Sequence, residues 1–347
     1  MKKVLALILA LATLFTLAAC ASNGEQSDPS SKDPANKPVK IGYISPDSDT
    51  WYLRAEEGAR WACEKANAEF KSVNSHRDSE QEIANIEQLI NEGVDCIVML
   101  SWNEAGCVAC AQMCKEANIG CVIFDACGAM AKHEGLEYTA AVDFDWASMG
   151  DIYAEWMNKN YPGEGFAFIN GTLDSLVCQN LALVKEASEK IGSNHMVDMR
   201  YCDYNPENAA NEAEDLVNSG LDFSIIGTCN EDCAAAVITR LQDMGVKDKY
   251  HVFSQNGSET GIKLLKDGTL EFTIASSPGL EAAVSVFAGI DYVRNGGEKN
   301  RQISCPIASA TTENADDPYA VIPWAVNEEV WINIIRNNFS EYAYFFN

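Results

Sequence analysis

From residue 40 onward, short apolar runs alternate with amphipathic stretches. Runs such as 96–100 (CIVML) and 120–125 (GCVIFD) are apolar almost throughout, as strands covered on both faces must be. The stretch 80–92 places Ile83, Ile86, Leu89 and Ile90 on one helical face and ends at a glycine, which favours a helix stop. This alternation predicts βαβ units, parallel sheets and right-handed crossovers.

One series of alternating strands and helices is predicted up to about residue 125, and a second series follows it. We expect strands at 41–44, 70–73, 96–100, 120–125, 138–142, 165–170, 195–202, 223–227, 250–253, 272–275 and 303–308. Helices are expected at 51–68, 80–92, 104–117, 146–158, 176–190, 206–219, 233–244, 259–266 and 280–293. Two successive runs of this kind predict an α/β protein with two doubly wound parallel-sheet lobes, and they disfavour the alternative of one closed barrel.

The first 38 residues are predicted to lie outside the fold. Lys2 and Lys3 precede an apolar run at 4–17 that is too short for a comfortable membrane span, so 1–19 is typical of a cleaved signal peptide. The sequence LAAC ending at Cys20 resembles a bacterial lipobox, which implies lipidation of Cys20; the alternative is an ordinary signal peptide with a chance cysteine. Residues 20–38 are polar and predict a flexible tether, which would leave the protein anchored to a membrane surface from outside the cytoplasm.

Chain length and net charge limit the number of domains and the kinds of molecule that the protein can bind. The chain has 347 residues, 47% of them apolar, which allows two domains of ordinary size. Its 25 basic and 51 acidic residues give a formal charge of −26. Nucleic acid binding needs a basic surface, so we expect no nucleic acid partner.

Thirteen cysteines are many for an exported chain, which would normally pair them as disulfides. Cys63, Cys96, Cys121 and Cys178 nevertheless sit inside apolar segments, where buried free thiols are the favoured interpretation. The pattern at 107, 110 and 114 lines one face of a predicted helix with no fourth ligand nearby in sequence. We therefore predict no metal and no cofactor, with disulfides and a metal site as the alternatives.

Small polar or charged residues recur where the predicted strands end, and aromatic residues stand beside several of them. At such edges open α/β sheets bind small ligands. Carboxylates and amides can bridge adjacent hydroxyls, and an aromatic face can pack on a sugar-like ring. Each residue alone is a common turn former or helix N-cap. The set is Ser45, Asp49, Trp51, Tyr52, Ser101, Trp102, Asp125, Tyr204, Asn230, Asn256 and Ser276.

An ordered series of segments resembles the periplasmic binding proteins of the ribose- and galactose-binding type. The segments are KIGYISPDSDTWYLRAEEGA, EQEIANIEQLINEGVDCIVML, ANIGCVIFDA, CNEDCAAAV, FSQNGS and LKDGTLEFTIASSPG. The resemblance spans about 40–308 and implies two lobes that close on a ligand by hinge bending. It implies crossings near 142–143, 276–277 and 304–306. The N-terminal lobe would then be 39–142 plus 277–304, and the C-terminal lobe 143–276 plus 305–347.

The resemblance also assigns roles to residues. It implies that Trp51 and Tyr52 sandwich the ligand, next to Asp49, and that Asp125 is the first-lobe carboxylate. Tyr204 and Asn230 would be the second-lobe aromatic residue and amide.

This chain departs from the family pattern at several of these positions. Ala126 stands where the family has an arginine, and a second family arginine falls near Gln179 or Asn180. Asn256 and Ser276 replace an aspartate and a glutamine. Because arginine recognises anions and paired hydroxyls, its absence disfavours sugar acids and phosphates.

The predicted function is that of a substrate-binding lipoprotein of an ABC importer, with a small neutral sugar or polyol as ligand and a transporter permease as partner. The alternatives are a receptor feeding a membrane kinase or chemoreceptor, and a binding protein for a nucleoside or amine. A helix-turn-helix repressor is excluded by the N-terminal signal and tether. The four histidines are scattered and no GxSxG, HExxH or phosphate-binding glycine loop occurs, so we predict no enzyme.

Overall fold

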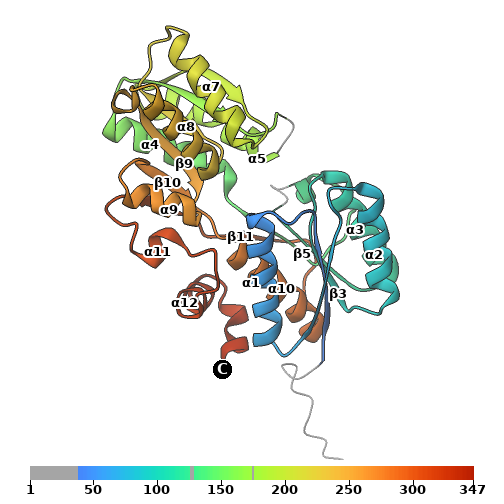
Figure 1. Cartoon of the computed structure of the whole chain (residues 1–347). Helices are drawn as coiled ribbons and strands as arrows, with labels where there is room; N and C mark the ends of the chain where they lie inside the picture. The colour runs from blue at the N-terminus through green and yellow to red at the C-terminus, as the bar shows by residue number, and fades with distance from the viewer. Residues whose placement is uncertain (1–37, 126–128, 174–175) are drawn as a thin grey trace, which may run out of the picture.

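The computed structural model describes residues 38–125, 129–173 and 176–347 (Figure 1). The predicted signal peptide, Cys20 and Ala126 therefore lie outside the described residues, as does most of the predicted tether. Within the described residues, no helix combines the length and the apolar character needed to cross a bilayer.

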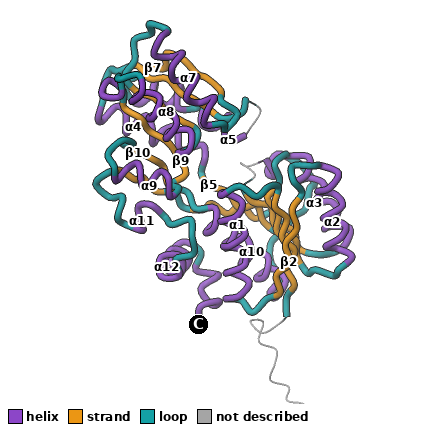
Figure 2. Tube along the Cα trace, in the orientation of Figure 1, coloured by secondary structure: helices purple, strands orange, loops and turns teal. Residues whose placement is uncertain are grey.

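The first lobe is built on a fully parallel six-stranded sheet. Its strand order is β11 (Arg301–Cys305), β5 (Ala140–Phe144), β4 (Gly120–Phe124), β3 (Cys96–Leu100), β1 (Lys40–Ser45) and β2 (Glu69–Asn74). Helices α1 (Thr50–Lys65) and α10 (Pro278–Asn295) cover one face, and α2 (Ser79–Asn91) and α3 (Glu104–Ala117) cover the other (Figure 2). A short 3₁₀ turn, η2 (Ala129–Lys132), lies between β4 and β5.

The second lobe repeats the plan with one strand reversed. Its strand order is β12 (Ala308–Thr311), β10 (Phe272–Ala275), β9 (His251–Asn256), β8 (Ile225–Thr228), β6 (Gly165–Asn170) and β7 (His195–Tyr201), and β12 is antiparallel to β10. Its helices are α4 (Trp146–Asn160), α5 (Leu176–Leu181), α6 (Val184–Ile191), α7 (Pro206–Asn218), α8 (Glu231–Asp243) and α9 (Glu259–Lys266), with a 3₁₀ turn η3 (Lys247–Lys249). The two doubly wound lobes confirm the predicted fold class.

Three segments connect the two sheets, after β5, after β10 and after β11 (Figure 1). The expected strand at 303–308 is in fact two strands, β11 and β12, which belong to different sheets. Pro306 lies between them, and proline has no N–H for a ladder hydrogen bond. The expected helix at 176–190 is likewise two helices, α5 and α6, which are separated at 182–183.

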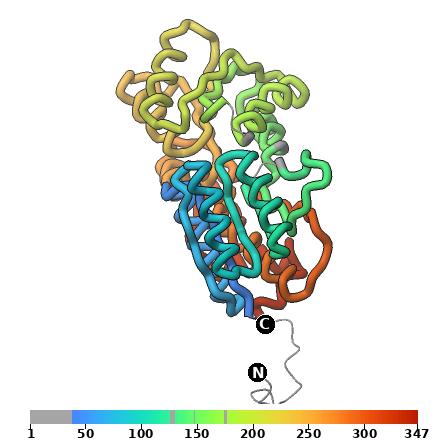
Figure 3. Tube along the Cα trace, turned by 90° about the vertical axis from the view of Figure 1, so that its right-hand side faces the viewer, coloured from blue at the N-terminus to red at the C-terminus, as the bar shows by residue number. Residues whose placement is uncertain are grey.

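The C-terminal tail differs from the expected assignment of 305–347 to the C-terminal lobe. The short helix α11 (Pro318–Val321) contacts β12 of the second lobe, but α12 (Glu328–Asn338) and η4 (Ser340–Phe346) pack on α1 and α10 of the first lobe (Figure 1). The C-terminus lies at the end of the first lobe that is remote from the second lobe (Figure 3). The ring of Trp61 on α1 lies edge-on to Trp331 at 5.4 Å and stacks with Phe346 at 6.1 Å. Aromatic burial against α1 therefore places the end of the chain on the first lobe.

Helices α1 and α10 approach each other unusually closely. A Cβ added at Gly58 would lie 1.9 Å from the carbonyl oxygen of Gly279, so the two backbones touch where neither residue has a side chain. This contact fixes α1, which begins beside the first strand, against α10, which returns from the second lobe.

Glu82 in the first lobe and Glu231 in the second lobe are both buried beneath the loops at the carboxyl edge of the sheet. Glu82 accepts from the Ser101 hydroxyl at 3.1 Å, and Glu231 accepts from the Gly257 N–H and the Thr273 hydroxyl, both at 2.6 Å. Burial raises the pKa of Glu231 to about 7, although these hydrogen bonds favour its charged form.

Trp331 tests the packing of the tail. Its fully buried ring donates to the Pro323 carbonyl at 3.1 Å, so Trp331→Ala is expected to lower the free energy of unfolding by about 3–5 kcal/mol. The control Trp102→Ala removes a ring that is 46% exposed and should change it by less than about 0.5 kcal/mol. Urea denaturation measures both, and equal losses would contradict this packing.

Glu231 is expected to make stability depend on pH. Because its pKa is raised in the folded state, the folded protein binds the extra proton, and stability falls as pH rises from about 4.5 to about 7. Glu231→Gln should remove this loss, which amounts to about 3 kcal/mol over the window. Thermal unfolding from pH 4.5 to 8 measures it, with the exposed Glu189→Gln as control. Parallel pH profiles for the wild type and Glu231→Gln would refute the prediction.

Candidate functional site

The loops at the carboxyl ends of the strands contain nearly all of the predicted ligand-binding residues. In the first lobe, Ser45 ends β1, Asp49 caps α1, Ser101 follows β3 and Asp125 follows β4. In the second lobe, Tyr204 follows β7, Asn230 caps α8, Asn256 ends β9 and Ser276 follows β10. The fold thus brings residues from distant parts of the chain to the edge where the crossing segments run.

Three carboxylates meet at this edge of the first lobe. Asp125, Asp143 on β5 and Glu281 in the first turn of α10 place carboxylate oxygens within 4.8 Å of one another. The Asp125 N–H donates to the Val142 carbonyl at 3.0 Å and to Glu281 Oε1 at 3.2 Å. We call these three residues the carboxylate cluster.

Burial raises the pKa of Asp125 and of Glu281 well above the usual range, and repulsion within the cluster raises both further. Asp125 Oδ1 and Glu281 Oε2 are buried without a hydrogen-bond partner among the described residues. By contrast, Asp143 Oδ1 accepts from the Trp146 indole at 2.5 Å and from the Phe144 N–H at 2.9 Å. The free oxygens of the other two acids are suited to accept from hydroxyl or ammonium groups.

Aromatic rings stand next to the carboxylate cluster. The Trp51 side chain favours the charged form of Asp125, and its ring lies edge-on to Phe144 at 6.3 Å and to Trp324 at 5.2 Å. The Trp324 indole donates to the Asn256 carbonyl of the second lobe at 2.9 Å. Trp51, Trp324 and Asn256 therefore form a chain of contacts from one lobe to the other.

Asp49 and Tyr52 are held by other residues. Asp49 Oδ1 accepts from the N–H groups of Trp51 and Tyr52 at 3.0 and 3.4 Å, as a helix N-cap does. Arg77 lies 3.7 Å from Asp49 Oδ2, pairs with Asp47 at 2.7 Å, and places its guanidinium 6.0 Å from the Tyr52 ring centre. The positive charge of Arg77 thus partly neutralises Asp49.

Three predicted polar side chains support local structure. The Ser45 hydroxyl donates to the Asp47 carbonyl, and Ser101 is engaged by Glu82 and by the Asn103 backbone. Asn230 accepts from the Cys233 N–H at 2.9 Å as the cap of α8. For these side chains the structure favours the turn and cap roles.

The second lobe offers polar atoms of its own. Asn256 Oδ1 and the Ser276 hydroxyl are buried and have no hydrogen-bond partner among the described residues. Asn256 also has a positive φ of 100°, a conformation that few non-glycine residues adopt.

The other predicted residues of the site are more open. Tyr204 is 38% exposed, with its hydroxyl 3.1 Å from Cys178 Sγ, and Trp102 is likewise exposed. Gln179 is exposed and Asn180 half-buried on α5.

The sequence-based prediction missed Asp143, Glu281 and Trp324 as site residues. Glu281 did leave a signal, because it is the only charged residue in the apolar stretch 278–290. Trp324 lies in the C-terminal extension, whose position the strand and helix pattern did not predict.

Comparison with known proteins agrees with this architecture. A sequence family described as a periplasmic binding protein domain matches residues 41–299. The chain is 23% identical to the fructose import binding protein FruE of Bifidobacterium longum, over 82% of this chain and 88% of that protein. It is 22% identical to the ribose import binding protein RbsB of Bacillus subtilis, over 90% of this chain and 99% of that protein.

Solved structures share the fold. An ABC transporter solute binding protein from Bacillus halodurans with bound myo-inositol superposes with a TM-score of 0.69 at 20% identity, covering 82% of this chain and 98% of that one. A periplasmic solute binding protein from Actinobacillus succinogenes with bound D-allose gives 0.72 at 18% identity, covering 81% and 100%. The related proteins are binding proteins for transport, which agrees at the family level with the prediction of no enzyme. This chain belongs to the periplasmic binding protein family.

Proposed function

We propose that this protein is the extracytoplasmic binding lipoprotein of an ABC importer and that it captures a small neutral sugar or polyol between its two lobes. The observation that carries the proposal is the set of buried polar atoms on both lobes, at Asp125, Asn256 and Ser276, that lack a hydrogen-bond partner among the described residues. The Trp51 ring contacts Trp324, whose indole donates to the Asn256 carbonyl. Fructose and ribose import proteins among the relatives, and myo-inositol and D-allose in the structural neighbours, support this class of ligand.

Polar side chains would bind the hydroxyl groups at the edges of the ligand, and an aromatic ring would pack on its apolar face. Asp125 and Asn256 offer acceptor oxygens to hydroxyl groups, and the Ser276 hydroxyl can both donate and accept. The indole of Trp51 offers an apolar surface to the C–H face of a ring. A neutral polyhydroxylated molecule matches both demands.

Ligand binding would act by a population shift between open and closed arrangements. Contacts from both lobes favour the closed arrangement, and the closed shape would dock on the permease. One ion pair already joins the lobes, because Arg54 on α1 lies 2.7 Å from Glu259 at the start of α9. An exposed pair of this kind contributes less than about 1 kcal/mol, so the ligand would supply most of the free energy of closure.

A lipid on Cys20 and the polar tether at 20–38 would keep the domain near its membrane partner. A partner that senses ligand, such as a membrane kinase or chemoreceptor, would use the same closed form. Pull-down of the ligand-bound domain from membranes containing either a permease or a sensor distinguishes the two.

Trp51→Ala and Asp125→Ala are expected to abolish sugar binding, because they remove the ring surface and the buried acceptor. Isothermal titration against a panel of neutral sugars and polyols measures the loss, and circular dichroism checks folding. Leu53→Ala removes a side chain that is 50% exposed on the same helix and should bind as the wild type does. Normal binding by both site variants would show that the site is assigned incorrectly.

The carboxylate cluster favours a second candidate, an amine-bearing ligand such as an amino sugar. No lysine or arginine of the described residues forms an ion pair with Asp125 or Glu281, so a ligand ammonium could supply the missing positive charge.

Glu281→Gln separates the two ligand classes, because it keeps the shape of the side chain and removes the acid that a bound ammonium group would hold in its charged form. Affinity for an amino sugar should fall at least about tenfold, which is about 1.4 kcal/mol, and affinity for the matched neutral sugar should change much less. Titrations of both ligands at neutral pH measure the difference, with the exposed Glu189→Gln as control. Equal effects on the two ligands would exclude recognition of the amine by this cluster.

A further inference from the structure

Two groups of three cysteines lie apart from the carboxylate cluster, one in each lobe. The first-lobe thiol triad is Cys110, Cys114 and Cys121, and the second-lobe thiol triad is Cys202, Cys229 and Cys233. Within each triad all three sulfur atoms lie within 4.8 Å of one another, and every one of these side chains is at most 2% exposed. The described residues contain no disulfide between them.

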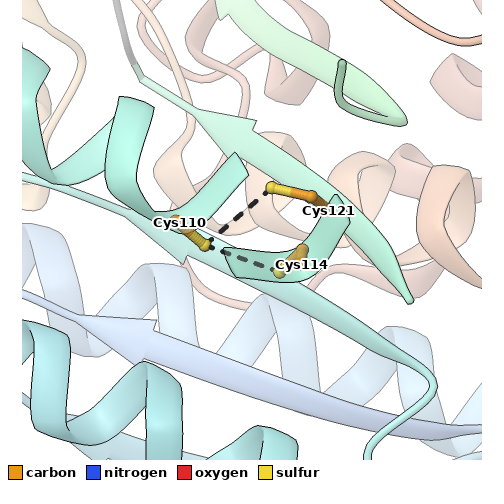
Figure 4. A group of neighbouring side chains, drawn as sticks. All are labelled: Cys110, Cys114 and Cys121. Atoms are coloured by element: carbon orange, nitrogen blue, oxygen red, sulfur yellow. Dashed lines mark hydrogen bonds between the residues drawn. The ribbon is translucent and has the colours of Figure 1, made fainter. Parts of the chain in front are cut away.

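Each triad is assembled from a helix and the adjacent strand edge. Cys110 and Cys114 lie one turn apart on α3, and Cys121 on β4 points toward them from the sheet (Figure 4). The sequence pattern 107, 110 and 114 thus named two of the three residues, whereas the third comes from the next strand. In the second lobe, Cys202 follows β7, Cys229 follows β8 and Cys233 lies in the first turn of α8.

Two of the three sulfur–sulfur distances in each triad match those around a single ion, and the third is within 4.8 Å. Cys110 Sγ lies 4.0 Å from Cys114 Sγ and 3.8 Å from Cys121 Sγ. Cys202 Sγ lies 3.8 Å from Cys229 Sγ and 3.7 Å from Cys233 Sγ. Three sulfurs at about 2.3 Å from one metal ion are about 3.8 Å apart at tetrahedral angles and about 4.0 Å apart at trigonal angles.

The donor set selects soft ions. Both groups consist of cysteines alone, without a histidine or carboxylate, and thiolate ligands favour Cu(I) and Zn(II) over hard cations. Zinc normally takes a fourth ligand, which neither group supplies within the described residues. A three-coordinate Cu(I) ion therefore fits these buried triads best.

Cys121 also lines a small surface hollow of about 20 Å³, next to Lys115 and Lys299, so the first-lobe triad lies close to the protein surface.

We propose that each thiol triad binds one soft metal ion of the Cu(I) class through three cysteine sulfurs. On binding, three S–H bonds break, three metal–sulfur bonds form and three protons leave to solvent. No electron is transferred, so no oxidant or reductant is required. Closely packed free thiols without affinity for metal are the competing explanation.

The test is an anaerobic titration of the reduced full-length chain with Cu(I) against a chromogenic Cu(I) chelator. Cys20 and Cys127, which lie outside the described residues, are serine in every protein used. We expect one tightly bound ion per triad, with loss of one equivalent in Cys114→Ser, loss of one in Cys202→Ser, and loss of both in the double variant. The matched control Cys63→Ser removes a buried thiol outside both triads and should keep both ions.

Stoichiometry that is unchanged in the triad variants, or absent in the starting protein, would overturn the proposal. X-ray absorption on the copper-loaded protein with intact triads decides the case even where a variant fails to fold. It should show a shell of sulfur atoms at about 2.3 Å. A shell dominated by nitrogen or oxygen would place the ion elsewhere and refute the assignment.

Discussion

The close approach of α1 and α10 at Gly58 and Gly279 is the constraint on which the rest of the molecule depends. Helix α1 leads from β1 and presents Trp51 to the site, and α10 returns from the second lobe and presents Glu281. Any side chain at this contact would force the two helices apart. Trp51 and Glu281 would then move apart. The Trp61 ring on α1, against which Trp331 of the C-terminal tail packs, would also be displaced. One backbone contact therefore couples the packing of the first lobe to the geometry of the site.

Local periodicity was enough to predict the two lobes, because each strand and helix is a short segment with its own apolar pattern. The errors arise where one continuous pattern spans two environments. Residues 303–308 resemble a single strand, yet β11 and β12 join different sheets on either side of Pro306. The tail after residue 317 carries an apolar pattern that shows it is buried but does not indicate on which lobe. Its position is decided by the aromatic surface of Trp61 and Phe287, which only the folded first lobe presents.

For the candidate site, the sequence predicts which residues lie at strand ends, but not the contacts that those residues make in the folded chain. Residues at strand ends could be named from sequence, since the carboxyl edge of a parallel sheet is where its loops gather. Sequence could not tell which of them keep free polar atoms. Local hydrogen bonds in turns and helix caps occupy the side chains of Ser45, Ser101 and Asn230. By contrast, polar atoms without a partner among the described residues remain on Asp125, Asn256 and Ser276. Asp143 and Glu281 are 138 positions apart and become neighbours only through the crossings.

The charge of the carboxylate cluster bears directly on ligand recognition. The residue that follows Asp125 in the sequence is Ala126, which carries no charge that could offset the cluster. Buried acids in this situation lower their free energy by holding protons, which is why the pKa values of Asp125 and Glu281 are raised. A protonated acid donates a hydrogen bond to a sugar hydroxyl, and an ionised one accepts from a hydroxyl or an ammonium. In the proposed site, the protonation of this cluster would therefore determine which polar groups of a ligand are bound.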